Sequence, residues 1–219
     1  MNSLRKIVVN LVVSGVFFLH SANVLAMTTL QIVDQHGKPL PQAVVEVDGQ
    51  TKASTANLQE IAIMDQVDKQ FSPRVLVIQQ GQSVLFPNSD NTRHHVYSFS
   101  AVKPFEIKLY SGKRKDPILF DHHGVAVLGC NIHDSMVGYI YIAQSDVTAI
   151  SDEQGMVHFP QQLTKKSQVS VWHSLAESGA ESRLTVKLDE LTFDGNQYVI
   201  NLQVHEPQKR NTFGDKFGQ

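Results

Sequence analysis

The sequence lacks the features that define several large protein classes. It contains a single cysteine, Cys130, so no disulfide can form within the chain and a disulfide-stapled scaffold is excluded. Lysine and arginine number 19 against 21 aspartates and glutamates, and the formal charge of −2 argues against a general nucleic-acid binder, which has a strong basic excess. Beyond the N-terminal region, no stretch is long and apolar enough to cross a bilayer.

Residues 1–26 read as a secretory signal peptide. Arg5 and Lys6 form a short positive region, an apolar stretch follows, and small residues precede a cleavage site after Ala26. No cysteine lies beside that site, so a lipid anchor is not expected, and the mature chain is expected in the periplasm. In such an oxidising compartment the lone Cys130 thiol is expected to be buried or bound to a ligand.

Short runs rich in valine, isoleucine and tyrosine dominate the rest of the chain and predict strands. Glycine, proline, asparagine or aspartate bound these runs, and no segment has a long 3.6-residue apolar period. We therefore expect an all-β protein, built as a sandwich or a barrel. The two segments with a partly helical spacing are residues 54–62 and 173–178, and the polar tail, residues 207–219, is expected to be mobile.

Three metal-binding side chains recur at a spacing of three residues in LGCNIHDSM, namely Cys130, His133 and Met136. Upstream, His94 and His95 stand at the head of a strand-like run. Two imidazoles and a thiolate with a weak methionine sulfur are the ligands of a blue-copper electron-transfer site. The thiolate is a soft donor that suits copper, and the spacing would supply three ligands from one loop and the fourth from a neighbouring strand.

Other uses of these side chains stay open on the residues alone. Structural zinc could use His122 and His123 with Cys130 and His133, although the usual second cysteine is missing. A cysteine nucleophile is a weaker alternative, since base and nucleophile usually come from separate elements around a cleft. A single buried cysteine can also be a small apolar core residue.

Residues 53–143 resemble the cupredoxin family. The resemblance is carried by MDQVDKQFSPRVLVIQQGQSVLFPNSD, by HHV, and by the Cys-x-x-His-x-x-Met loop, which is closest to that of amicyanin. The segment also looks like periplasmic cupredoxin-type proteins labelled methylamine-utilisation proteins. The resemblance implies a Greek-key β-sandwich that holds one type 1 copper through His94, Cys130, His133 and Met136. Val96 aligns with the valine of the family's His-Asn-Val and favours His94 over His95 as the first ligand.

The segments on either side resemble a second fold. LQIVDQHGKPLPQAVVEVDG and VTAISDEQGMVHFPQQLTKKSQVSVWH are similar to parts of a carboxypeptidase-regulatory-like, transthyretin-type β-sandwich. We therefore predict that residues 27–52 and 144–206 form one split sandwich, into which the cupredoxin domain, residues 53–143, is inserted. The alternative, that both flanks add strands to one enlarged sandwich, stays open. Trp172 and His173 are expected in the sandwich core and at its edge.

The resemblance also implies a function. The copper would carry single electrons without transforming a substrate, so the chain is expected not to be an enzyme. His133 would lie under a surface patch that meets a periplasmic redox protein, such as a c-type cytochrome or a dehydrogenase. The alternative is a non-redox periplasmic copper store, chaperone or interaction module. The basic segment SGKRKD, residues 111–116, is better explained as a solvated loop than as a docking site.

Overall fold

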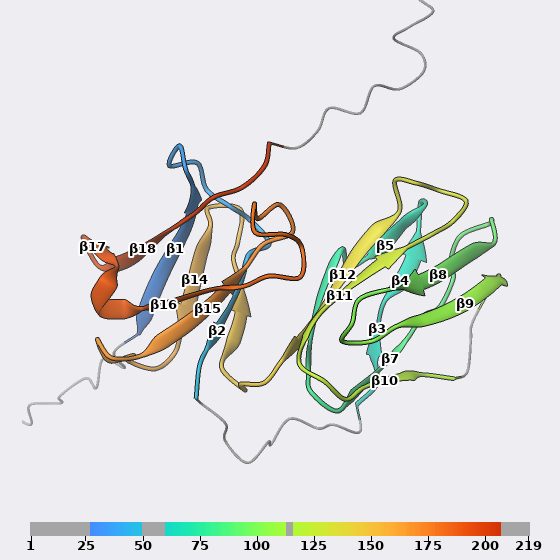
Figure 1. Ribbon diagram of the computed structural model, residues 1–219, viewed down its shortest axis with the longest axis horizontal. Coiled ribbons are helices and arrows are strands. Elements are labelled where there is room, and N and C mark those ends of the chain that lie inside the picture. The colour runs from blue at the N-terminus through green and yellow to red at the C-terminus, as the bar shows by residue number, and fades with distance from the viewer. Residues whose placement is uncertain (1–26, 50–59, 113–115, 207–219) are drawn as a thin grey trace, which may run out of the picture.

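The computed structural model describes residues 27–49, 60–112 and 116–206 (Figure 1). Within these ranges the regular structure is β-strand, interrupted by one short 3-10 helix, η1 (Leu188–Glu190), so the all-β prediction is confirmed. None of the described helical structure is long and apolar enough to cross a membrane. The predicted signal peptide, the tail, most of the segment 54–62 and the centre of the basic segment 111–116 lie outside the described residues.

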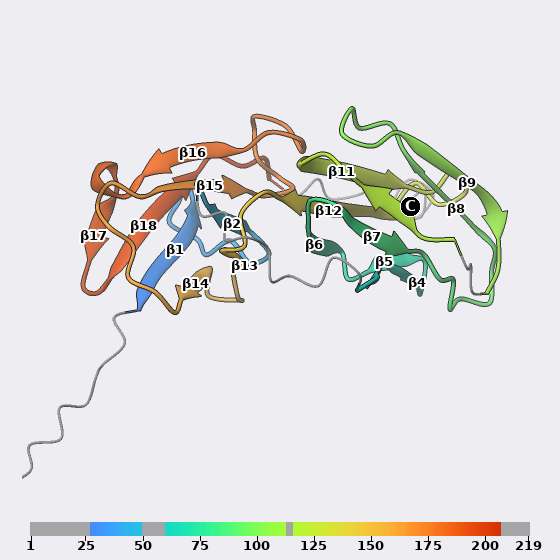
Figure 2. The same cartoon turned by 90° about the horizontal axis from the view of Figure 1, so that it is seen from below.

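Strands from the two ends of the chain pair with one another in two sheets. One sheet has the order β14–β1–β18–β17, with bounds Met156–Phe159, Thr28–Asp34, Gln197–Leu202 and Thr192–Asp194. The other has the order β13–β2–β15–β16, with bounds Thr148–Ile150, Val44–Val47, Gln168–Trp172 and Leu184–Lys187. We call these two sheets the flanking sandwich; they form one end of the elongated molecule (Figures 1 and 2).

The period of two along β2 and β15 determines what the flanking sandwich buries. Val45 and Val47 lie opposite Val171 and Val169, and all four side chains are at most 1% exposed in one apolar core. Successive residues of a strand point to opposite faces, so the intervening side chains point out of this core. Residues 173–178, whose spacing is partly helical, form turns and a bridge at Ala176 instead, because they connect two strands at the sandwich edge.

The middle of the chain forms a second unit, which we call the central sandwich. Its larger sheet has the order β6–β12–β11–β8–β9, with bounds Val75–Gln79, Val137–Ala143, Gly124–Gly129, His94–Ser98 and Phe105–Tyr110. Its smaller sheet has the order β10–β7–β3, with bounds Ile118–Phe120, Gln82–Leu85 and Ala62–Ile63. A hairpin of β4 (Asp65–Val67) and β5 (Gln70–Ser72) lies beside them. A separate apolar core fills the space between these sheets.

The two sandwiches meet on the outer face of the larger central sheet. Tyr139 and Tyr141 on β12 pack with Val44 and Trp172 of the flanking sandwich in a third buried cluster. Trp172 is fully buried, as expected of a core residue, and it lies at this junction rather than among the side chains between the two flanking sheets. The reason is its register: Val171 points into that core, so its neighbour on β15 must point outward.

A buried carboxylate also ties the two units together. Glu46 on β2 is 2% exposed and accepts a hydrogen bond from the Tyr141 hydroxyl at 2.7 Å. The backbone N–H groups of Gln144 and Ser145 donate to its other oxygen at 2.7 and 2.6 Å, and Arg183 approaches at 3.3 Å. That the central unit is a domain inserted into the flanking one stays a prediction. Whether each sandwich folds alone stays a prediction.

Candidate metal centre

The first histidine of the pair reaches the interior of the central sandwich because of its position on β8. Val96 points into the central core, and His94, two residues earlier, shares that face. His94 is fully buried. Its neighbour His95 points to the opposite face, where its Nε2 atom lies 2.9 Å from the Glu106 carboxylate.

The single cysteine follows directly after β11. A tight loop then runs to β12, closed by hydrogen bonds from the His133 amide to the Cys130 carbonyl at 3.4 Å and from the Met136 amide to the His133 carbonyl at 2.9 Å. The loop brings His133 back over the sulfur of Cys130. Cys130 is 4% exposed, whereas His133 is half-buried, so His133 is the member of the group that reaches the surface.

The three side chains converge on one point. The Cys130 Sγ atom lies 3.9 Å from His94 Nδ1 and 3.8 Å from His133 Nδ1, and the three donor atoms all lie within 4.8 Å of one another. A metal about 2.0–2.1 Å from each nitrogen and about 2.3 Å from sulfur, with donors about 120° apart, requires a nitrogen–sulfur spacing of about 3.8 Å. The spacing therefore fits three donors of one ion, and a His/Cys/His set is consistent with type 1 copper.

The carboxylate of Asp90 orients the first of these donors. Its Oδ2 atom lies 2.7 Å from His94 Nε2. An ionised carboxylate only accepts hydrogen bonds, so Nε2 carries the proton and Nδ1 keeps its lone pair for a metal. Burial alone would raise the pKa of the Asp90 carboxyl, but hydrogen bonds from the Lys69 amide, from His94 and from the Asp68 amide together lower it.

A glycine lets an aromatic ring lie against the backbone beside the cysteine. Gly129 and Tyr97 are opposite each other in the β8–β11 pair. A Cβ atom at position 129 would lie 2.6 Å from both Cζ and Oη of Tyr97, closer than atoms can approach. The ring therefore covers the strand end that carries Cys130. Neither Asp90 nor Tyr97 was identified from the sequence; the one available signal was a carboxylate four residues before His94.

The other sequence-predicted residues take different positions. Met136 is 1% exposed and belongs to the same apolar core as Cys130, and its role as a fourth ligand stays a prediction. His122 and His123 are exposed and precede β11, whereas Cys130 follows it. That six-residue strand spans about 20 Å, so a zinc site shared with Cys130 is not supported. In the described part of the chain, no convergent group of three or more His, Cys, Asp or Glu side chains includes them.

Comparison with known proteins adds solved structures only. No protein-family model and no curated protein sequence matches the chain. The copper-containing nitrite reductase of Thermus scotoductus is 26% identical, with a TM-score of 0.36 over 38% of this chain and 22% of the enzyme's chain. A mutant of amicyanin in its reduced Cu(I) form is 15% identical, with a TM-score of 0.35 over 45% of this chain and 97% of its own. The purple cupredoxin of Nitrosopumilus maritimus is 21% identical, with a TM-score of 0.33 over 37% and 97%.

The chain is similar to cupredoxins over less than half of its length. It spans about a fifth of the nitrite reductase that it matches. Each of these TM-scores is below 0.5, and the metal centre is inferred from the donor geometry of His94, Cys130 and His133 alone. The identity of the flanking sandwich stays a prediction.

Proposed function

We propose that the chain is an exported type 1 copper protein that carries single electrons between redox partners in the periplasm. His94, Cys130 and His133 would bind the copper, with Met136 as a weak fourth ligand. The observation that carries the proposal is the convergence of three donor atoms within 4.8 Å at a largely buried position. Bound copper would supply the one-electron chemistry, by alternating between Cu(II) and Cu(I).

The chain's own residues suit a site of this kind. Cys130 is a buried thiol whose sulfur lies 3.9 Å and 3.8 Å from the Nδ1 atoms of His94 and His133, so one soft donor and two imidazole donors face the same point. His94 is held by Asp90, so this ligand is oriented before a metal arrives. Ligands that are already in position before the metal binds should move little when the metal changes oxidation state.

The asymmetry between the two histidines supports a carrier with one accessible side. His94 is fully buried and His133 is half-buried. A partner would therefore approach on the His133 side, where Ile132 is 50% exposed. We propose a periplasmic redox protein, such as a c-type cytochrome or a dehydrogenase, as that partner, and no substrate that the chain itself transforms.

Spectroscopy of the copper-loaded protein tests the proposal. One equivalent of Cu(II) should give intense visible absorption from thiolate-to-copper charge transfer and an EPR signal with the narrow hyperfine splitting of type 1 copper. The colour should disappear with one electron per copper and return on reoxidation. A colourless Cu(II) adduct with an ordinary tetragonal EPR signal would exclude the electron-carrier role and leave a copper store or chaperone.

A further inference from the structure

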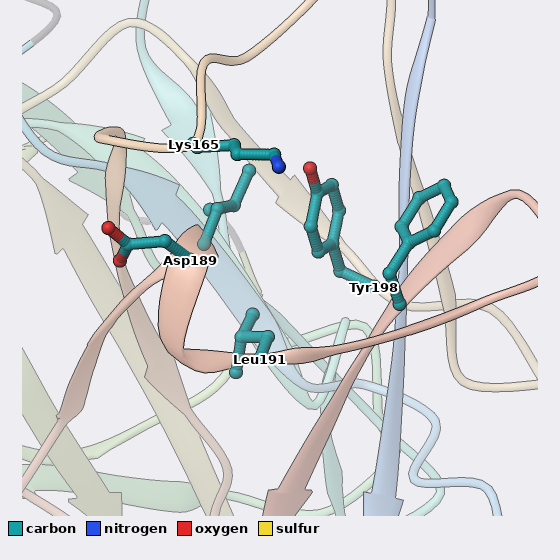
Figure 3. A pocket seen from close by; sticks show the side chains of 6 residues that line it. Lys165, Asp189, Leu191 and Tyr198 are labelled. Carbon is teal, nitrogen blue, oxygen red and sulfur yellow. The ribbon is translucent and has the colours of Figure 1, made fainter.

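A hollow at the far end of the flanking sandwich lies away from the metal centre. It has a volume of about 420 Å³ and is lined by the loop before β15, by η1 and by the strands β17 and β18 (Figure 3). Small-molecule sites typically occupy about 300–1,000 Å³. The rim is tied to the sandwich by hydrogen bonds from the Asp189 amide to the Lys165 carbonyl and from the Leu188 amide to the Ser167 carbonyl, both 3.0 Å.

One wall of this hollow is an aromatic pair. Phe193 and Tyr198 lie opposite each other across β17 and β18, with ring centroids 4.9 Å apart and planes at 62°. Phe193 is 59% exposed, so its ring is accessible to a ligand. Leu188 is fully buried beneath the hollow, and Leu191 is partly buried beside it. This wall suits a flat apolar ring, since aromatic side chains contact rings edge-to-face or in offset stacks.

Two hydrogen-bond donors, the Lys165 ammonium and the Tyr198 hydroxyl, lie close together at the edge of the hollow (Figure 3). Figure 3 shows the Lys165 ammonium and the Tyr198 hydroxyl pointing toward one another across the hollow, and the Asp189 carboxylate pointing away from them. Within the residues that the structure describes, no side-chain hydrogen bond or ion pair joins either donor to another protein group. A lysine ammonium has donors and no acceptor, so an anionic acceptor complements this position.

We propose that this hollow binds a small molecule in which an apolar ring carries a carboxylate. The ring would contact Phe193 and Tyr198, and the carboxylate would lie between the Lys165 ammonium and the Tyr198 hydroxyl. The proposal does not depend on copper, because the hollow shares no residue with the metal centre. It gives the flanking sandwich a binding role of its own.

NMR titration of the intact metal-free protein with benzoate tests the proposal, with benzyl alcohol as the uncharged probe of the same ring. Benzoate should shift the amide signals of residues 188–193 and 197–198 and should bind more tightly than benzyl alcohol. Equal binding of the two probes would overturn the role of Lys165. An absence of shifts at these amides would overturn the site.

Conservative variants distinguish the contribution of the Lys165 charge to binding from an effect of the substitution on folding. Lys165→Met should weaken benzoate binding about two- to fivefold, as expected for an exposed ion pair, and leave benzyl alcohol unaffected. Tyr198→Phe keeps the ring and should also weaken benzoate. Lys166→Met, which removes the neighbouring exposed ammonium outside the hollow, is the matched control and should change nothing. An equal loss in Lys166→Met would show that benzoate responds only to the overall charge of the loop.

Discussion

The Asp90 carboxylate accepts a hydrogen bond from Nε2 of His94, with Oδ2 and Nε2 2.7 Å apart. The other ring nitrogen, Nδ1, faces the Cys130 sulfur. The same carboxylate accepts the amides of Asp68 and Lys69 at 2.8 Å each. Both residues have positive φ, +51° and +57°, a conformation that costs energy for side chains other than glycine. Asp90 therefore joins a strained hairpin turn to the first histidine of the metal centre.

Asp90→Ala should weaken copper binding because the His94 imidazole loses the group that fixes its tautomer and orientation. The expected loss is about 10- to 100-fold in affinity, the usual range for a carboxylate behind a metal-bound histidine. Competition with a chelator of known affinity measures it. Glu106→Ala is the matched control, since Glu106 contacts Nε2 of His95 at 2.9 Å, and copper affinity should not change. Equal effects of the two substitutions would mean that Asp90 has no specific role.

The rank order of substitutions at the ligands is a second expectation. Cys130→Ser should abolish the colour, because a hydroxyl cannot replace the soft thiolate. His94→Ala should open the site, whereas His95→Ala should keep the spectrum, since His95 points to the other face of β8. Visible and EPR spectra of the copper-loaded variants decide the matter. A stronger loss at His95 than at His94 would reverse the assignment.

Met136→Leu should keep copper and raise the reduction potential. Met136 is buried beside Cys130, and leucine has a similar volume, so the apolar packing should survive. Loss of a weak axial sulfur disfavours Cu(II) relative to Cu(I). Redox titration compares the two proteins. An unchanged potential would assign Met136 to core packing alone.

The sequence predicted the metal-binding side chains better than the residues that hold those side chains in position. Cys130 and His133 share one loop, so their spacing alone brings their donor atoms together. His94 could be preferred over His95 because Val96 sets the register. Asp90, by contrast, contacts His94 directly but is itself held by the amides of a hairpin turn that is distant in sequence, a pairing that exists only in the folded chain. Trp172 is buried as expected, but its place at the junction could not be predicted: it shares a strand face with Gln168 and Ser170, and only the tertiary structure shows that this face covers a second sandwich.

The stability of the flanking sandwich should fall in mild acid because of His173. Burial lowers the pKa of this imidazole below its ordinary value, while a hydrogen bond to the Pro41 carbonyl raises it and the Arg74 charge lowers it. In the pH range just below the ordinary value of about 6.5, the unfolded chain binds a proton that the folded chain does not. The free energy of unfolding therefore decreases as pH falls through that value.

Denaturant unfolding at about pH 7.5 and about pH 5.5 measures this dependence on the two sides of an ordinary histidine pKa. His173→Gln should reduce the difference between the two conditions, whatever its effect on stability at the higher pH. His123→Gln, at an exposed turn of the central sandwich, controls for the loss of an imidazole and should keep the difference. A pH dependence that is the same in His173→Gln and in the unsubstituted protein would contradict the expectation.

The split architecture can be tested by separating the two sandwiches. Residues 53–143 contain every strand of the central sandwich and the three converging donors, so this segment should fold and bind copper when expressed alone. It should be less stable than the intact protein, because Val125, Tyr139 and Tyr141 lose their cover on the outer face. Polar substitutions at Val125 and Tyr139 should then improve solubility without changing the spectrum, since neither side chain belongs to the central core.

The complementary piece joins residues 27–52 to residues 144–206 through a short Gly-Ser linker. Its two sheets contain all of their own strand partners, so it should unfold in a single cooperative transition. In the intact protein, the hydrogen bond from Tyr141 to Glu46 links the units. Tyr141→Phe removes it and should increase the difference between the unfolding midpoints of the two sandwiches. If the central segment forms no copper site even with the polar substitutions, while the intact protein does, the two sandwiches are one folding unit. The insertion would then be wrong, but the three-donor site would stand, because its donors come from β8 and from the loop that joins β11 to β12, whichever unit those strands belong to.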